Sequence, residues 1–278
     1  MRRRFFVEQF EGDRAVMEGE AAHHLGRVLR AQIGQVYELS DGQRACLARI
    51  EEVKRDRVEF ALVEELPVYR PAFQTTLLIS VVKFDSFEWA MEKATELGVG
   101  RIVPLAAARS EKALLSAAPK RTERWKKILL EASQQSRRVS IPALAHLAKP
   151  EAAFSSRAEG LRILLSERPD APPLRSILEG DGSIGRITDA TAEEANQAIG
   201  GPAEEANRAI GDPEGRRAAG GTTAVTLAIG PEGGWTDAEF DAARAAGFQE
   251  ASLGRLILRT ESAVIAALAA LNYALGED

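Results

Sequence analysis

A glycine-rich turn at residues 228–235, "AIGPEGGW", could cradle a ligand against the main chain. Gly230, Gly233 and Gly234 lack a Cβ atom, so they allow unusual backbone geometry and let a ligand approach the peptide groups. Their spacing matches neither the dinucleotide fingerprint nor a phosphate loop with lysine. A similar run at 209–215, "AIGDPEG", lacks the strand and helix that flank the first turn. We therefore predict that residues 228–235, and not residues 209–215, form the ligand-binding turn.

A second candidate is a polar group at the entrance of an apolar helix. In "LGRLILRTESAVIAAL" (253–268), Arg259, Thr260 and Glu261 directly precede a run without charged residues. These residues fit a helix cap with one ion pair, and they equally fit a group that acts on a ligand. The residues alone leave both interpretations open.

Positive charge is concentrated locally, although the net charge of the chain is −5. Residues 101–140 hold ten Lys/Arg against three Asp/Glu, whereas residues 155–220 hold eight against twelve. A local patch matters more for phosphate binding than the net charge. Arg137 and Arg138, in "EASQQSRR", end a predicted helix, where they could complement the helix dipole or hold phosphate. The basic segment is therefore either a solvated helix face or a nucleic-acid surface.

The composition excludes several classes of protein. One cysteine, Cys46, excludes an internal disulfide framework and favours a reducing compartment. We find no signal peptide and no apolar run long enough to span a membrane, so we expect a cytoplasmic protein without membrane contact. His23 and His24 are adjacent and point in different directions, and with only three histidines we expect no metal site.

The elements that must position these residues fall into two groups. Residues 1–70 contain alternating strand-like segments ("QVYELSDG", "RACLARIEEV", "RVEFALVEEL"), a hairpin signal at Asp41-Gly42 and one short helix, "EAAHHLGRVLRA". Pro67 and Pro71 mark a linker. From residue 74 onward, strands alternate with helices, which predicts a mostly parallel sheet covered by helices.

The 228–235 turn has a defined place in that alternation. The strand "AVTLAI" precedes it, and a helix follows in which Thr236 and Glu239 form a capping box. In open α/β sheets ligands bind beyond the carboxyl ends of the strands, which is where this turn lies.

One segment interrupts the pattern between the strands "LRILLSE" and "AVTLAI". "TAEEANQAIGG" (191–201) is followed directly by "PAEEANRAIGD" (202–212), a tandem duplication with few large apolar residues. Lengthening a surface loop costs little free energy. We expect residues of about 180–221 to be a mobile insertion, and the sequence assigns no role to it.

Five motifs in order carry a resemblance to a known family: "HHLGRVLR", "EKATELGV", "EASQQSRR", "IGPEGG" and "LGRLILRTESA". The chain resembles the 16S ribosomal RNA (uracil-N3)-methyltransferases of the SPOUT class, over nearly its whole length except 180–221. The resemblance implies a PUA-like RNA-binding β-barrel at 1–70 and an α/β trefoil-knot methyltransferase domain at 74–278. It also implies a homodimer, S-adenosylmethionine as methyl donor, and 16S rRNA or the small ribosomal subunit as partner.

The resemblance also implies which residues hold the methyl donor. They lie in three loops of the knot, and the predicted cofactor-binding residues are Leu165, Ser166, Glu167, Ile229, Gly230, Pro231, Glu232, Gly233, Gly234, Leu253, Gly254, Leu256 and Leu258.

The reaction suggests further roles within the same motifs. A cation near the uracil carbonyls would stabilise the N3 anion, and Arg259 is the candidate. Glu261 or Glu232 is the candidate base, or the group that orients the arginine. RNA affinity is expected from basic side chains of both domains: Arg2, Arg3, Arg4, Arg27, Arg30, Lys83, Arg109, Arg137 and Arg138.

The chain departs from the family pattern at three positions. Phe84 and Arg137 stand where the family usually has glycine, and Ser262 stands where it has threonine. These departures put fine substrate contacts in doubt more than the activity. The alternative is an RNA-binding or ribosome-assembly factor that has the fold without catalysis, and donor binding by calorimetry would separate the two.

Overall fold

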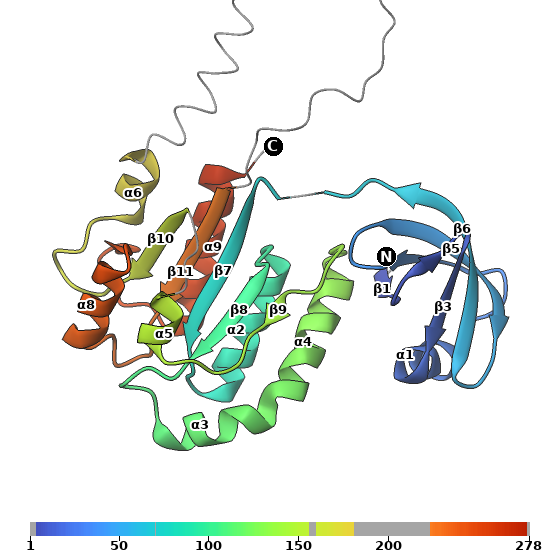
Figure 1. The fold of residues 1–278 in the computed structure, drawn as a ribbon, viewed down its shortest axis with the longest axis horizontal. Helices are drawn as coiled ribbons and strands as arrows, with labels where there is room; N and C mark the ends of the chain where they lie inside the picture. Colours follow the sequence, from blue (N-terminus) through green and yellow to red (C-terminus); the bar gives the residue numbers. More distant parts are fainter. Residues whose placement is uncertain (1–3, 70, 156–159, 181–222, 277–278) are drawn as a thin grey trace, which may run out of the picture.

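The computed structural model describes residues 4–69, 71–155, 160–180 and 223–276, which form two sheets with separate cores (Figure 1). The duplicated run and nearly all of the predicted 180–221 insertion lie outside the described residues. The division into units 1–70 and 74–278 stays a prediction. The last strand of the first sheet ends at Leu66, and the first strand of the second sheet begins at Phe73.

The N-terminal sheet has the strand order β1-β4-β5-β6-β3-β2 and ends at β1 and β2. Its strands are β1 (Arg4–Phe6), β2 (Phe10–Glu11), β3 (Arg14–Glu18), β4 (Val36–Ser40), β5 (Ala45–Val53) and β6 (Arg57–Leu66). All neighbours are antiparallel except β1 and β4, which are parallel.

The hairpin predicted at Asp41-Gly42 is confirmed. Ser40 pairs with Ala45, and the turn between them places Gly42 at a φ of +90°, in the left-handed region. Asp41 Oδ1 accepts hydrogen bonds from the main-chain N–H groups of Gln43 and Arg44. An Asx turn of this kind fixes the register of β4 and β5.

The predicted N-terminal helix is confirmed, with a change of type along its length. It begins as α1 (Gly19–His23) and continues as a π-helical turn over His24–Val28. Ala22 and Leu25 are fully buried against the sheet. Arg27 and Arg30 stay exposed.

The second sheet is entirely parallel, as the alternation of strands and helices predicts. Its strand order is β12-β10-β11-β7-β8-β9. The strands are β7 (Phe73–Ser80), β8 (Arg101–Leu105), β9 (Ala143–Leu144), β10 (Leu161–Leu165), β11 (Thr223–Ile229) and β12 (Gln249–Ala251). The helices are α2 (Phe84–Glu96), α3 (Lys112–Ala117), α4 (Thr122–Gln135), α5 (Pro150–Phe154), α6 (Leu174–Gly180), α8 (Asp237–Ala245) and α9 (Thr260–Leu275).

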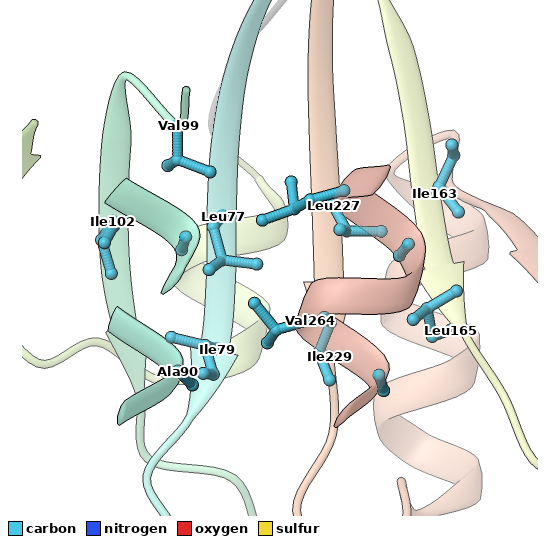
Figure 2. Close-up of a cluster of buried hydrophobic side chains, with 14 of the residues drawn as sticks. Leu77, Ile79, Ala90, Val99, Ile102, Ile163, Leu165, Leu227, Ile229 and Val264 are labelled. Atoms are coloured by element: carbon cyan, nitrogen blue, oxygen red, sulfur yellow. The ribbon is translucent and has the colours of Figure 1, made fainter. Parts of the chain in front are cut away.

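Helices cover both faces of this sheet, which explains why its central strands carry apolar residues on both faces. On one face Leu77 and Ile79 of β7 pack with Leu227 of β11, against Ala90 of α2 and Val264 of α9 (Figure 2). A separate cluster, which includes Leu78, Phe154 and Phe240, fills the opposite face under α5 and α8. The sheet is therefore a rigid platform whose carboxyl edge carries the loops of interest.

Candidate functional site

A pocket of about 440 Å³ lies at the carboxyl ends of β10, β11 and β12. Its walls are residues 165–169 after β10, 229–235 after β11 and 253–258 after β12. Thr260 and Ala263 of α9 close it. The lining contains every residue predicted to hold the methyl donor: Leu165, Ser166, Glu167, Ile229, Gly230, Pro231, Glu232, Gly233, Gly234, Leu253, Gly254, Leu256 and Leu258.

Hydrogen bonds join these three walls to one another. The Trp235 indole Nε1 donates to the Leu165 carbonyl at 3.0 Å, which links the second wall to the first. Thr260 Oγ1 donates to the Gly230 carbonyl at 3.1 Å and so holds the start of α9 against the second wall. Because each bond crosses between segments far apart in the sequence, the pocket is fixed by tertiary structure rather than by any one loop.

The glycines of the 229–235 turn are needed for two different physical reasons. A Cβ atom on Gly230 would lie 3.1 Å from the Trp235 ring, so the turn must pass close to the indole. Gly234 has a φ of +68°, in the left-handed region that favours glycine. The turn therefore presents its main chain to the pocket, as the sequence predicted.

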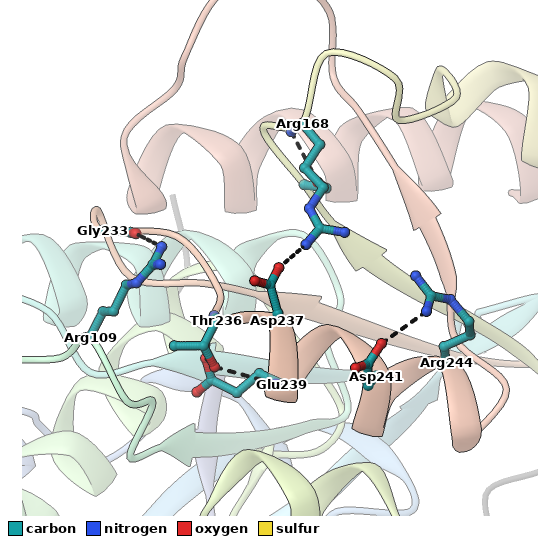
Figure 3. A network of polar contacts seen from close by, with 9 residues as sticks. Arg109, Arg168, Gly233, Thr236, Asp237, Glu239, Asp241 and Arg244 are labelled. Atoms are coloured by element: carbon teal, nitrogen blue, oxygen red, sulfur yellow. Dashed lines mark hydrogen bonds and ion pairs between the residues drawn. The ribbon is translucent and has the colours of Figure 1, made fainter.

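The capping box predicted at Thr236 and Glu239 is confirmed (Figure 3). Thr236 Oγ1 accepts from the Glu239 main-chain N–H, and the Glu239 carboxylate accepts from the Thr236 N–H at 2.8 Å. The second Glu239 oxygen accepts from the Ala108 N–H at 2.8 Å. This buried carboxylate thus fixes the start of α8 and the connection after β8 together.

Several lining residues escaped the sequence analysis. The Arg168 guanidinium stacks 3.7 Å from the centre of the Phe240 ring. It also pairs with the Asp237 carboxylate (Figure 3). Trp235 follows the glycine turn directly, and that adjacency was its only signal in the sequence. The others missed in the lining are Pro169, Arg255, Ile257 and Ala263.

The residues present fit S-adenosylmethionine, the donor implied by the resemblance. The volume lies within the range of small-molecule sites, roughly 300–1,000 Å³. Exposed peptide groups of the glycine turn can bond a purine and a ribose, and the Glu167 and Glu232 carboxylates can offset a sulfonium charge. Leu256 and Ile257, which are 83% and 78% exposed, supply apolar surface at the rim.

The three predicted catalytic residues occupy different environments. Glu232 lines the pocket, and its exposed side chain has no partner among the described residues. Glu261 accepts a hydrogen bond of 3.1 Å from Ser86 Oγ and does not line the pocket. Arg259 is exposed at the N-cap position of α9, also outside the lining. Of the three side chains, the structure brings only Glu232 into the pocket.

Arg4 and Arg138 are the two predicted RNA-binding arginines of the described residues that are not exposed, and both make contacts within the chain. Arg4 is buried and pairs with Glu38 at 3.2 Å. Arg138 Nη1 donates to the Thr95 carbonyl at 2.8 Å, and burial lowers the pKa of its guanidinium. Both contacts hold structure in place, so RNA contacts by these two side chains would compete with them.

The remaining predicted cations are more accessible. Arg27, Arg30, Lys83, Arg109 and Arg137 are exposed, whereas Arg2 and Arg3 lie outside the described residues. Arg109 Nη1 donates to the Gly233 carbonyl at 2.7 Å, which places this arginine at the rim of the pocket (Figure 3).

Arg137, at a position where the family resemblance implies glycine, has a φ of +55°. The position therefore needs a left-handed backbone, and that need explains the usual glycine.

Among residues 4–69, 71–155, 160–180 and 223–276, no group of three or more His, Cys, Asp or Glu side chains could hold a metal ion. Within the same ranges, none of the helices combines the length and the apolar character needed to cross a membrane.

The sequence is similar to those of known RNA methyltransferases. Residues 69–200 and 187–272 match the model of an RNA methyltransferase domain, and residues 18–63 match an RNA methyltransferase PUA domain. The chain is 31% identical to a ribosomal RNA small subunit methyltransferase E of Synechocystis sp. over 258 residues, covering 90% of this chain and 70% of that protein. The Bacillus subtilis protein of the same name is 28% identical, covering 92% and 88%.

A solved structure extends the similarity to three dimensions. The ribosomal RNA small subunit methyltransferase E of Neisseria gonorrhoeae, bound to S-adenosyl methionine, superposes with a TM-score of 0.76 at 26% identity, over 99% of each chain. The predicted fold class, a SPOUT-type parallel α/β domain preceded by a small PUA-like β domain, is confirmed. By its matched domains, its relatives and its fold, the chain belongs to the RNA methyltransferase family.

Proposed function

We propose that the protein transfers a methyl group from S-adenosylmethionine to the N3 atom of a uridine in 16S rRNA of the small ribosomal subunit. The observation that carries the proposal is the pocket at the carboxyl ends of β10, β11 and β12, lined by all the residues that the family resemblance implies. Relatives named ribosomal RNA small subunit methyltransferase E, one of them bound to the donor, support the same substrates. A factor without catalysis is the weaker interpretation, because the donor-sized pocket is fully formed.

The chemistry makes modest demands on the protein. The donor supplies an electrophilic methyl group on a cationic sulfur. Uracil N3 is a weakly acidic imide that attacks best as an anion, so the opposite charges neutralise one another in the transition state. A site that excludes water does not oppose this change. The protein must therefore position the two reactants in line and remove the N3 proton.

The proposed division of labour follows the sequence prediction. Arg259 stabilises the uracil anion, and Glu232 or Glu261 removes the proton or orients the arginine. Arg259 lies between the lining residues Leu258 and Thr260, which supports a role at the rim. An Arg259→Ala variant should keep its affinity for the donor while methylation falls about a hundredfold or more. Full turnover in that variant would contradict the role.

We also propose that the protein acts as a homodimer in the cytoplasm. The dimer is supported by α9, which carries no charged residue from Ser262 to Leu275. Ser262, Ala269 and Tyr273 are exposed at helical spacing, and Ile265 between them is half-buried. An uncharged exposed helix face of this kind is typical of an interface.

The experiment that tests the proposed function uses the purified protein and the donor. Small ribosomal subunits and naked 16S rRNA are each incubated with it, and the modified base is mapped by mass spectrometry. Methylation at a single uridine N3 is expected. Methylation of another atom would refute the assigned reaction, and absence of transfer together with intact donor binding would favour the factor without catalysis.

A further inference from the structure

A second pocket adjoins the donor pocket on the other side of the 229–235 turn. It has a volume of about 310 Å³ and lies at the carboxyl ends of β11, β7 and β8. Residues 81–83 after β7 form one wall, residues 109–111 with Leu114 form the second, and residues 232–233 form the third. The two pockets therefore stand side by side along one edge of the sheet, and the turn after β11 separates them.

The pockets share a wall made of three residues. Arg109, Glu232 and Gly233 line both of them. The Arg109 guanidinium is held to the Gly233 carbonyl by the hydrogen bond of 2.7 Å, which stiffens this wall. Since methyl transfer needs donor and acceptor in contact, the acceptor must enter a space that borders the donor pocket. The second pocket meets that requirement.

Polar groups in the second pocket lack partners within the protein. Ser110 is 8% exposed, and in the part of the chain that the structure describes its Oγ has no hydrogen-bond partner. A buried hydroxyl left without a partner is costly, so it points to a group that arrives from outside. The side chains of Lys83 and Glu232 are exposed and make no ion pair with any described residue.

We propose that the second pocket receives the target uracil, unstacked from the RNA, and that Glu232 accepts the N3 proton there. This inference rests on the proposed function. Enzymes that modify a base take it out of the stack and bind its polar edge. The Lys83 ammonium and the Ser110 hydroxyl can donate to the two uracil carbonyls, which flank N3. Glu232, and not Glu261, belongs to both linings.

The proposed step balances as follows. The Glu232 carboxylate accepts the N3 proton, and the N3 electron pair forms the new bond to the methyl carbon. The pair of the broken carbon–sulfur bond stays on sulfur, which becomes a neutral thioether. Glu232 then releases its proton to water, so the carboxylate is restored and no further reactant is consumed.

The test uses three variants of the full chain and one control. Ser110→Ala and Lys83→Gln remove the proposed donors, and Glu232→Gln removes the base. Arg101→Gln is the control, because it also removes one positive charge but lies at the amino end of β8, at the opposite edge of the sheet. Affinity for S-adenosylmethionine is measured by calorimetry, and kcat/KM is measured for 16S rRNA.

The expected results separate binding of the donor from binding of the target. Donor affinity should stay within about twofold for Ser110→Ala and Lys83→Gln, while kcat/KM for RNA falls about tenfold. Glu232→Gln should lower kcat about a hundredfold, because the amide cannot accept the N3 proton. Arg101→Gln should match the wild type. If Ser110→Ala and Lys83→Gln lowered donor affinity as much as they lower kcat/KM for RNA, the pocket would belong to the donor and the inference would be overturned.

A direct binding measurement distinguishes this inference from the proposed function. Uridine 5′-monophosphate is the probe, titrated in the presence of S-adenosylhomocysteine. Weaker binding to Ser110→Ala and Lys83→Gln than to Arg101→Gln supports the pocket assignment even if the wild type methylates no RNA, in which case the proposed function fails alone. Unchanged nucleotide binding and unchanged RNA kinetics overturn the inference, while methylation by the wild type leaves the proposed function intact.

Discussion

Arg4 Nη1 of the N-terminal sheet donates a hydrogen bond of 2.6 Å to the main-chain carbonyl of Arg137 at the end of α4. The same guanidinium pairs with Glu38 of β4, and each of these two side chains is only 9% exposed. Arg137 Nη1 in turn lies 3.6 Å from Glu38 Oε1. Next to this group, Ser40 Oγ donates to the Val139 carbonyl at 2.7 Å. A polar clamp of Arg4, Glu38 and Arg137 thus joins the PUA-like sheet to the methyltransferase domain.

Breaking the clamp should destabilise the protein. Arg4→Ala leaves the buried Glu38 carboxylate without its closest partner, which should lower the free energy of unfolding by on the order of 3 kcal/mol. Urea unfolding measures this change. The double variant Arg4→Ala, Glu38→Ala should recover part of the loss, because no buried charge is left unpaired. Equal stability of the single and double variants would contradict the account.

Donor binding should depend on the space around Gly230. Gly230→Ala places a Cβ against the Trp235 ring, whose indole holds Leu165, so both walls must shift and donor affinity should fall about tenfold or more. Gly233→Val should have a larger effect and abolish donor binding, since its Cβ would lie 3.2 Å from Arg109 Cβ and its branched side chain needs still more space. Calorimetry with S-adenosylmethionine is the measurement.

Gly100→Ala provides the matched control for the glycine variants. A Cβ there would meet only the Thr75 carbonyl, at an ordinary 3.7 Å, and donor affinity should not change. Gly215, which the sequence analysis separates from the functional turn, lies outside the described residues, and a change there is still expected to do little.

RNA affinity should decrease as the salt concentration rises, and each exposed arginine that contacts a phosphate should contribute to that decrease. Arg27 is exposed on the N-terminal unit, and Arg27→Ala should weaken RNA binding and reduce the slope of log affinity against log salt by about 0.9 if it contacts one phosphate. Filter binding at several salt concentrations measures the slope. Arg49→Ala is the control, because Arg49 is already paired with Glu51 at 2.9 Å. A slope unchanged by Arg27→Ala would remove Arg27 from the RNA surface.

The proposed dimer should be sensitive to charge on α9. Ile265→Asp introduces a carboxylate on the uncharged face of that helix, and burying an unpaired charge in an interface is strongly unfavourable. Analytical ultracentrifugation should show a dimer for the wild type and a monomer for the variant. Circular dichroism checks that the variant is folded. A wild-type monomer at micromolar concentration would refute the proposed dimer.

Stability at alkaline pH should depend on Cys46. Burial is the main cause that raises the pKa of this thiol above its ordinary value, and the Glu65 carboxylate adds to it. The folded state therefore holds the thiol proton more tightly than the unfolded chain does. This contribution is complete below the ordinary thiol pKa and is lost as pH rises from there toward the folded value. Between neutral pH and about pH 10, the wild type should lose more stability in urea than Cys46→Ala does. Parallel curves would contradict this.

The order of strands and helices could be predicted from the sequence because it depends on local patterns. The apolar run ending at Ile229, the glycines after it and the Thr236 cap each act within a few residues. The donor loops could be predicted only through the family motifs, because nothing local in "LRILLSE" indicates that Leu165 contacts Trp235.

The roles of residues that depend on tertiary partners could not be predicted from the sequence. Arg4 is one cation among several in "MRRRFF", and charge alone does not reveal that Glu38 neutralises it. Ser110 has no distinguishing neighbour in the chain, and its importance arises only because burial leaves its hydroxyl without a partner among the described residues. Short elements such as α3, α5 and β9 were missed because their few residues give no clear periodicity.

The hydrogen bond from Thr260 to Gly230 has a consequence for the newly made protein. The strands β7, β8, β10 and β11 are all synthesised before Thr260, and they can assemble while the chain is still growing. The third wall and α9 are made after these strands, so the nascent chain can hold a nearly complete sheet and still have no donor site. Methyl-donor binding therefore begins only when α9 has been translated and docked, so an occupied pocket reports that the sheet and this helix have already assembled.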